Sequence, residues 1–223
     1  DLERLGFSVG DIVAIDPQPE FIDNGFIVSR HLDDKAGVAV LFATIEALVR
    51  EKPELAVDTV FLFSIAEEVG YGGSSILTHD IASMVTIDNG TTAPGQNSSE
   101  FGVTVAMADQ TGPFDWHLTD KLVRLCKEND IRYQKDVFRY YRSDSAAALE
   151  AGADVRTALI TFGVDASHGY ERIHLHALRS LAELATAYVT SPVEIQRDAE
   201  PVGSLLGFPS QPMEDAAPTT SDP

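Results

Sequence analysis

The chain has 223 residues, of which 44% are hydrophobic, and this is enough to bury one good core. Its 35 acidic and 16 basic residues give a formal net charge of −19, which argues against nucleic acid or an anionic membrane as a partner. A single cysteine, Cys126, excludes an internal disulfide framework. Because no apolar stretch approaches ~20 residues and the start is not signal-like, we expect a cytoplasmic protein.

The first 30 residues are rich in turns and in residues typical of β-strands. Two strands are predicted, at 11–16 and 25–29, with a Pro-rich turn between them. Two strands do not form a stable unit alone, so residues 1–30 are expected to be the end of something larger.

From Asp33 onward, helices and strands alternate. The expected order is a helix from Asp33 to about Arg50, a strand at about 58–65, a short helix after Gly73, strands at 83–87 and 101–107, a helix at 114–128, a strand at 132–138, a helix at 143–150, a strand at 157–162 and a helix at about 171–189. This alternation predicts an α/β sheet covered by helices on both faces, over residues 31–193. The Pro-, Ser- and acid-rich residues 194–223 are predicted to be a disordered tail.

Four groups of polar residues fall in predicted loops beside these elements: His31–Gly37, Glu67-Glu68, Asp88–Gly90 and Asp165–Glu171. The adjacent carboxylates of Glu67 and Glu68 repel each other at the mouth of a sheet, so a positive charge is expected nearby. Carboxylates together with a histidine form a ligand set that zinc accepts. Two such ions a few ångströms apart could activate water and polarise a carbonyl group.

Each group also has an ordinary explanation. Asp33 and Asp34 can cap a helix, Glu67-Glu68 can be a solvated loop, and Asp88-Asn89-Gly90 is typical of a turn. His168 can be an ordinary loop histidine. The order of all four groups along one chain is what favours a site.

In that order, and with their flanking residues, the groups resemble the glutamyl-aminopeptidase or tetrahedral aminopeptidase family of dinuclear metallopeptidases. The resemblance is carried by residues 32–37, 66–70, 85–88 and 167–171. It implies a mixed sheet flanked by helices, hydrolysis of N-terminal residues from small peptides, two divalent ions (zinc or cobalt), and a homo-oligomer. Segments 93–98, 111–117 and 138–144 further resemble a bacterial branch associated with the osmolyte N-acetylglutaminylglutamine amide, which an acidic composition also suits.

The resemblance assigns roles residue by residue. It implies that Asp33 bridges both ions, that Glu68 and His168 complete one metal site, and that Asp88 binds the other ion. Glu67 is implied as the general base, which takes a proton from the attacking water and returns it to the leaving amine.

Three further residues receive supporting roles from the same resemblance. Asp34 is expected to support the cluster by hydrogen bonding rather than by ligation. Arg142 and Asp144 are candidates for binding the substrate, although a structural salt bridge explains Arg142 equally well.

One ligand of the family pattern is not matched. The family has a histidine in an H-x-D motif near its N-terminus, whereas no histidine here precedes His31. Roughly the first third of the family's chain is therefore expected to be missing, with residues 1–30 as closing strands of a small β-barrel. His31-Leu32-Asp33 does read H-x-D, but His31 is also explained as a residue at a strand end. Whether a second ion binds, and whether this chain is active, stay open.

Two other functions are compatible with parts of the pattern. A metal-free glycosidase also uses paired carboxylates, but acids adjacent in sequence do not flank a bond across a cleft. A non-catalytic metal-binding or scaffolding protein of the same fold would keep the acidic site without turnover.

Overall fold

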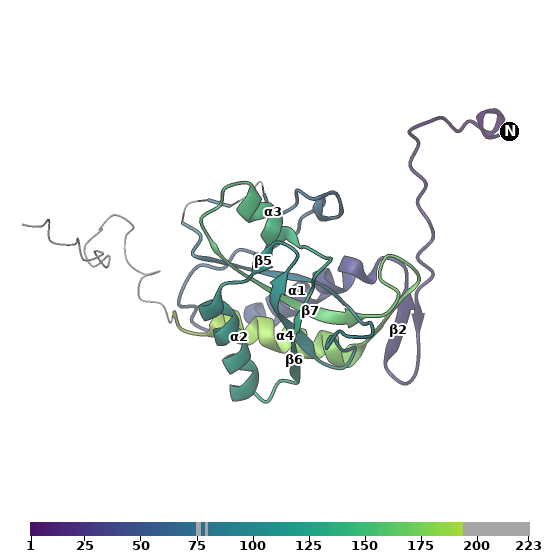
Figure 1. Cartoon of the computed structure of the whole chain (residues 1–223). Coiled ribbons are helices and arrows are strands. Elements are labelled where there is room, and N and C mark those ends of the chain that lie inside the picture. Colours follow the sequence, from purple (N-terminus) through teal and green to yellow (C-terminus); the bar gives the residue numbers. More distant parts are fainter. Residues whose placement is uncertain (75–76, 79, 194–223) are drawn as a thin grey trace, which may run out of the picture. The chain divides into compact units, whose positions relative to one another are not determined.

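The central sheet of the computed structural model has five strands and is mixed (Figure 1). The structure describes residues 1–74, 77–78 and 80–193. The strands run in the order β3-β7-β4-β5, with β6 paired to β4; their bounds are β3 Ser83–Thr91, β4 Val103–Asp109, β5 Gly112–Pro113, β6 Tyr133–Val137 and β7 Arg156–Val164. β3 and β7 are parallel, β7 and β4 antiparallel, and β4 and β6 parallel. The expected mixed α/β fold is confirmed.

Helices cover this sheet. Three of them pack on one another and on the strands: α1 Leu32–Glu51, α2 Trp116–Glu128 and α4 Leu175–Thr190. The short helix α3, Asp144–Glu150, contacts β3 and β7 and is drawn above β5 and β7 in Figure 1, with α2 and α4 below those two strands. Two separate apolar clusters match this arrangement. The larger joins α1, α2 and α4 to β4 and β7, and the smaller consists of Ala106, Phe114, Phe138 and Leu159.

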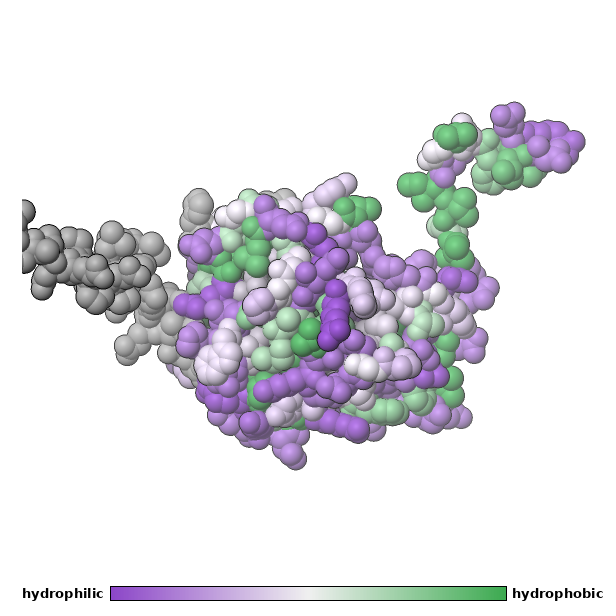
Figure 2. Space-filling view, in the orientation of Figure 1, coloured by the Kyte–Doolittle hydropathy of each residue, from purple (hydrophilic) through white to green (hydrophobic). Residues whose placement is uncertain are grey.

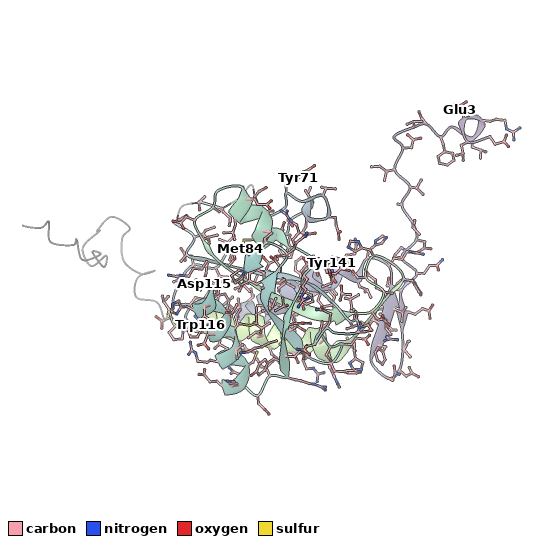
Figure 3. The ribbon with its side chains drawn as sticks, in the orientation of Figure 1. Glu3, Tyr71, Met84, Asp115, Trp116 and Tyr141 are labelled. Atoms are coloured by element: carbon pink, nitrogen blue, oxygen red, sulfur yellow. The ribbon has the colours of Figure 1, made fainter. Side chains whose placement is uncertain are left out.

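The start of α2 shows why local sequence was a good guide to this part of the chain. Asp115 is the N-cap, and its carboxylate accepts a hydrogen bond from Leu118 N over 2.8 Å. The apolar side of the helix then buries Leu118, Leu122 and Cys126. Asp115 and Trp116 mark this helix start in Figure 3.

A second, three-stranded antiparallel sheet has the order β1-β2-β8, with β1 Glu20–Phe21, β2 Phe26–Ser29 and β8 Glu171–His174. The prediction of one helix over 171–189 is wrong at its start, because residues 171–174 pair with β2 and the helix begins only at Leu175. This pairing brings residues 26–29 and 171–174 together beside the start of α1. Two 3₁₀ turns, Glu3–Leu5 and Glu67–Val69, complete the elements.

Two predicted strands are not strands. Residues 11–16 and 58–65 have no strand assignment, and Ile12 and Ile65 are exposed. Figure 2 shows hydrophobic residues along the first part of the chain, in keeping with this exposure. An apolar run becomes a strand only when a neighbouring strand supplies its hydrogen bonds, and no described strand pairs with either segment. Phe63 instead stacks on Phe42 of α1, with ring centroids 5.1 Å apart.

The short helix after Gly73 falls partly on residues 75, 76 and 79, and the predicted tail 194–223 lies outside the described residues. That residues 1–30 belong to a β-barrel domain stays a prediction. None of the described helices is both long and apolar enough to cross a membrane.

Candidate active site

The first turn of α1 carries Asp33 and Asp34, which have non-helical backbone angles and are joined by a cis peptide bond. The Asp34 carboxylate accepts a hydrogen bond from Gly37 N over 3.3 Å, so it does serve as a cap for the helix. Asp33 is different, because its side chain is only 5% exposed and points toward His168 rather than back along the helix. The helix-cap explanation therefore applies to Asp34 and not to Asp33.

The loop with Glu67 and Glu68 is held by a carboxylate of α3. Asp144 is 7% exposed, and it accepts hydrogen bonds from Ser64 Oγ over 2.6 Å and from Gly73 N over 2.7 Å. A Cβ on Gly73 would lie 2.6 Å from the Asp144 backbone oxygen, so only glycine allows this approach. The loop that presents the paired glutamates is thus clamped at both ends by one buried side chain.

The strand predicted to end at residue 87 continues to Thr91, so Asp88 and Asn89 lie within β3 and not in a loop or turn, opposite Thr161 and Phe162 of β7 in the parallel ladder. The Asn89 side chain donates a hydrogen bond from Nδ2 to Asp33 Oδ2 over 2.7 Å. This contact joins the third predicted group of polar residues to α1. Analysis of the sequence assigned Asn89 only to a turn and gave no signal for this role.

His168 lies in the loop between β7 and β8, with a backbone φ of +62°. Its backbone N–H donates to Glu171 Oε1 over 2.9 Å, and Glu171 Oε2 accepts from Asp33 N over 3.0 Å. The sequence pattern included Glu171 in the motif at 167–171 but gave it no function. The structure buries this carboxylate between two of the predicted metal-binding residues.

Three of the predicted ligands come together in space. One ligand atom from each of Asp33, Glu68 and His168 lies within 4.8 Å of the others. His168 Nε2 is 3.2 Å from Asp33 Oδ2 and 3.5 Å from Glu68 Oε2. Two carboxylate oxygens and an imidazole nitrogen at these separations are a donor set that suits a divalent ion such as zinc.

The electrostatics of the site also fit a cation. Burial, with the charge of Glu68 next in size, raises the pKa of Asp33 to about 6. Burial and the charge of Asp144 raise the pKa of Glu67 to about 7. Burial, followed by repulsion from Asp88, holds the pKa of Asp34 well above its usual range, and burial followed by repulsion from Asp33 does the same for the pKa of Asp88. Carboxylates crowded in this way gain from a bound positive charge.

These side chains face a cavity of about 600 Å³. Its lining includes Asp33, Glu67, Glu68, Asp88, Asp109, Tyr141, Arg142, Asp144 and His168. Tyr141 is seen near the middle of Figure 3, and Tyr71, which follows the Glu67–Val69 turn, is drawn above it. All of the predicted site residues except Asp34 therefore line one cavity.

The predicted substrate-binding pair has other partners within the chain. Arg142 makes a bidentate ion pair with Glu150, with nitrogen–oxygen distances of 3.0 and 2.5 Å. This is the salt bridge that the sequence left as an equal alternative, although Arg142 still lines the cavity. His31 is exposed and is not among the described residues that line the cavity.

Comparison with known proteins places the chain in a family. The model of the M42 glutamyl aminopeptidase family matches residues 1–184. A putative aminopeptidase from Bacillus subtilis, YhfE, is 42% identical over 193 residues, covering 86% of this chain.

Solved structures show the same fold. The Pyrococcus horikoshii TET1 peptidase, which can assemble into a tetrahedron or a large octahedral shell, matches 77% of this chain with a TM-score of 0.69 and 23% identity. The aminopeptidase APDkam598 from Desulfurococcus kamchatkensis matches 85% of it with a TM-score of 0.68 and 21% identity. The chain covers 56% of YhfE and 52% and 55% of these two structures, so it spans about half the length of these relatives.

Proposed function

Because this chain belongs to the M42 glutamyl aminopeptidase family, we propose that it carries the metal-binding and proton-transfer residues of an aminopeptidase. Such an enzyme removes N-terminal residues from small peptides. The observation that supports the proposal most is the convergence of Asp33, Glu68 and His168 on one point, with Glu67 on the adjoining loop position.

In this proposal Asp33, Glu68 and His168 hold one divalent ion, zinc or cobalt. Asp88 would hold a second ion, and Asp33 would contribute to the binding of both. Asp34 would support the cluster without binding an ion, since its carboxylate accepts a hydrogen bond from Gly37 N and its pKa is raised by burial and by the charges of Asp88 and Asp33. When bound, divalent ions of this kind polarise the scissile carbonyl and acidify water.

Glu67 is the proposed general base. In the metal-free chain, burial and the charge of Asp144 raise the pKa of its carboxyl to about 7, and a carboxyl that can both gain and release a proton is what a proton shuttle needs. The Asp144 clamp holds the Glu67 loop at the wall of the cavity, so the proton would move at one defined position. Glu67 takes the proton from the attacking water and donates it to the leaving amine.

The finer assignments concern the substrate and the assembly. Arg142 and Asp144 remain the proposed substrate-binding residues, because both line the cavity. The resemblance to the osmolyte-associated branch supports a glutamine-containing dipeptide as one substrate to test. The assemblies of the TET1 peptidase support a homo-oligomer, which light scattering after size-exclusion chromatography would measure.

The test of the proposal combines metal content with turnover. The 223-residue chain is loaded with zinc or cobalt, dialysed and analysed, and then assayed on aminoacyl anilides and dipeptides. We expect about two ions per chain and hydrolysis that Glu67→Gln reduces by at least ~100-fold, in keeping with loss of a general base. Glu128→Gln, at the far end of α2, is the matched control and should keep the parental rate.

The same experiment distinguishes an aminopeptidase from the second candidate function, a non-catalytic protein of the same fold. Metal binding without turnover, in parent and variant alike, would favour a non-catalytic metal-binding or scaffolding role. A chain that binds no zinc or cobalt would contradict the metal proposal, and parental turnover in Glu67→Gln would remove Glu67 as the base.

A further inference from the structure

We propose that Glu171 is a positioning residue that sets the separation of Asp33 and His168 through their backbone amides. The proposal rests on the proposed function of those two residues as metal ligands. Glu171 itself binds neither metal nor substrate in this account, because only 1% of it is exposed and, unlike Asp144, it is not among the described residues that line the cavity.

The buried carboxylate of Glu171 accepts one backbone hydrogen bond on each of its two oxygens. Only 1% of the residue is exposed. Oε2 accepts from Asp33 N over 3.0 Å, and Oε1 accepts from His168 N over 2.9 Å. Asp33 and Glu171 are 138 positions apart in the sequence, so one short side chain joins two distant segments.

The position of Glu171 is set by the three-stranded sheet β1-β2-β8. Glu171 is the first residue of β8 and lies opposite Ser29 of β2 in the antiparallel ladder. β2 ends two residues before His31, from which α1 begins. The strand pairing therefore holds Glu171 beside the start of α1, while the 165–170 loop returns His168 to the same carboxylate.

Both donors are backbone N–H groups, so the side chain between them must offer two acceptor atoms. A carboxylate offers two acceptor oxygens, so it satisfies both donors at once. A glutamine of the same shape offers one oxygen and one NH₂ group, so one backbone N–H would face another donor. Removing a single partner of a buried donor is costly, because the group is left unsatisfied.

The hydrogen bonds to Glu171 also affect the positions of the proposed ligand atoms, His168 Nε2 and Asp33 Oδ2. His168 holds a left-handed φ of +62°, which is uncommon for a residue with a side chain, and its N–H bond to Glu171 helps to keep it there. In this conformation His168 Nε2 lies 3.2 Å from Asp33 Oδ2. Loss of the two hydrogen bonds to Glu171 would free the His168 loop relative to α1 and widen the separation between His168 Nε2 and Asp33 Oδ2.

The experiment compares Glu171→Gln with Asp136→Asn. Asp136 is also a buried carboxylate, 8% exposed, that accepts from the backbone amides of Asn97 and Ser98, but it does not line the cavity. We expect Glu171→Gln to bind cobalt or zinc about 10- to 100-fold more weakly, the usual effect of losing a residue that orients a ligand. Asp136→Asn should lose stability but keep the parental metal affinity.

The kinetic constants of Glu171→Gln show whether Glu171 acts by positioning the ligands. If Glu171→Gln only misplaces the ligands, excess metal should restore much of its kcat with little change in KM. Parental metal affinity in a folded Glu171→Gln would overturn the proposal, and so would an equal loss of affinity in the Asp136→Asn control.

Amide hydrogen exchange keeps the proposal testable whether or not the variant folds or the chain is active. In the metal-free parent, the amides of Asp33 and His168 should be protected although both lie outside regular ladders. Exchange of either amide at the rate of an unstructured peptide would overturn the proposal. If the parent binds metal but hydrolyses nothing, the proposed enzymatic function fails, whereas metal affinity and exchange still decide the role of Glu171.

Discussion

Ser64 Oγ and Asp144 Oδ2 are 2.6 Å apart, and this hydrogen bond joins the segment before the paired glutamates to the first residue of α3. The other oxygen of Asp144 accepts from Gly73 N on the far side of the same loop. The clamp therefore determines where Glu67 and Glu68 stand in the cavity, and its loss can be measured separately from the chemistry.

Replacing Asp144 tests the clamp. Asp144→Ala should lower the free energy of unfolding by about 1–3 kcal/mol, because a buried backbone N–H is left without an acceptor. Asp144→Asn should lose less, since its oxygen can accept from Gly73 and its NH₂ can donate to Ser64. Urea unfolding measures both, with exposed Asp154→Ala as the control. Equal losses in the two Asp144 variants would contradict this account.

Removing the side chain of Asn89 should weaken metal binding in a pH-dependent way. The Nδ2 donor lowers the pKa of Asp33, so Asn89→Ala should raise that pKa further above about 6. Protons then compete better with the ion, and the loss of affinity should be larger at pH 6 than at pH 8. Isothermal titration with zinc at the two pH values measures the difference. A loss that is the same at both would show that Asn89 acts only through packing.

The metal-free protein should become less stable as the pH rises through the site's titration range. The pKa values of Asp33 and Glu67 are raised from ordinary values of 3.8 and 4.5 to about 6 and about 7. The folded state therefore binds more protons than the unfolded state between about pH 4 and pH 7, so its stability falls with rising pH there. Thermal melts across this range, with Glu67→Gln expected to flatten the dependence, measure it. A melting temperature that rises over the same interval in the metal-free parent would contradict the prediction.

Metal should stabilise the folded chain. A divalent ion at 100 times its Kd adds about 2.7 kcal/mol if it binds only the folded state. We expect zinc to raise the melting temperature, a chelator to reverse the rise, and His168→Ala to abolish most of it. His117→Ala, which removes an exposed histidine on α2, is the control and should keep the full zinc shift. The same shift in His168→Ala would exclude His168 as a ligand.

Elements whose signals are local could be read from the sequence. The predicted helix at 114–128 and strand at 157–162 appear as Trp116–Glu128 and Arg156–Val164, because a cap and a hydrophobic period are properties of neighbouring residues. The apolar run at 58–65 carries an equally clear pattern but forms no strand, since pairing depends on a partner elsewhere. Residues 171–174 show the converse, because pairing with β2 makes a strand of a segment that continues a helical pattern.

The sequence by itself determined the chemistry available to the site: four groups of acids and histidine in the order typical of one metallopeptidase family. Only the tertiary structure brought Asp33, Glu68 and His168 within 4.8 Å of one another and gave Arg142 a partner in Glu150. It also decided the role of Glu171, which joins backbone donors far apart in the chain. The physical reason is that residue type and order are local properties, whereas a hydrogen bond between distant segments exists only after the sheet and helices have placed them.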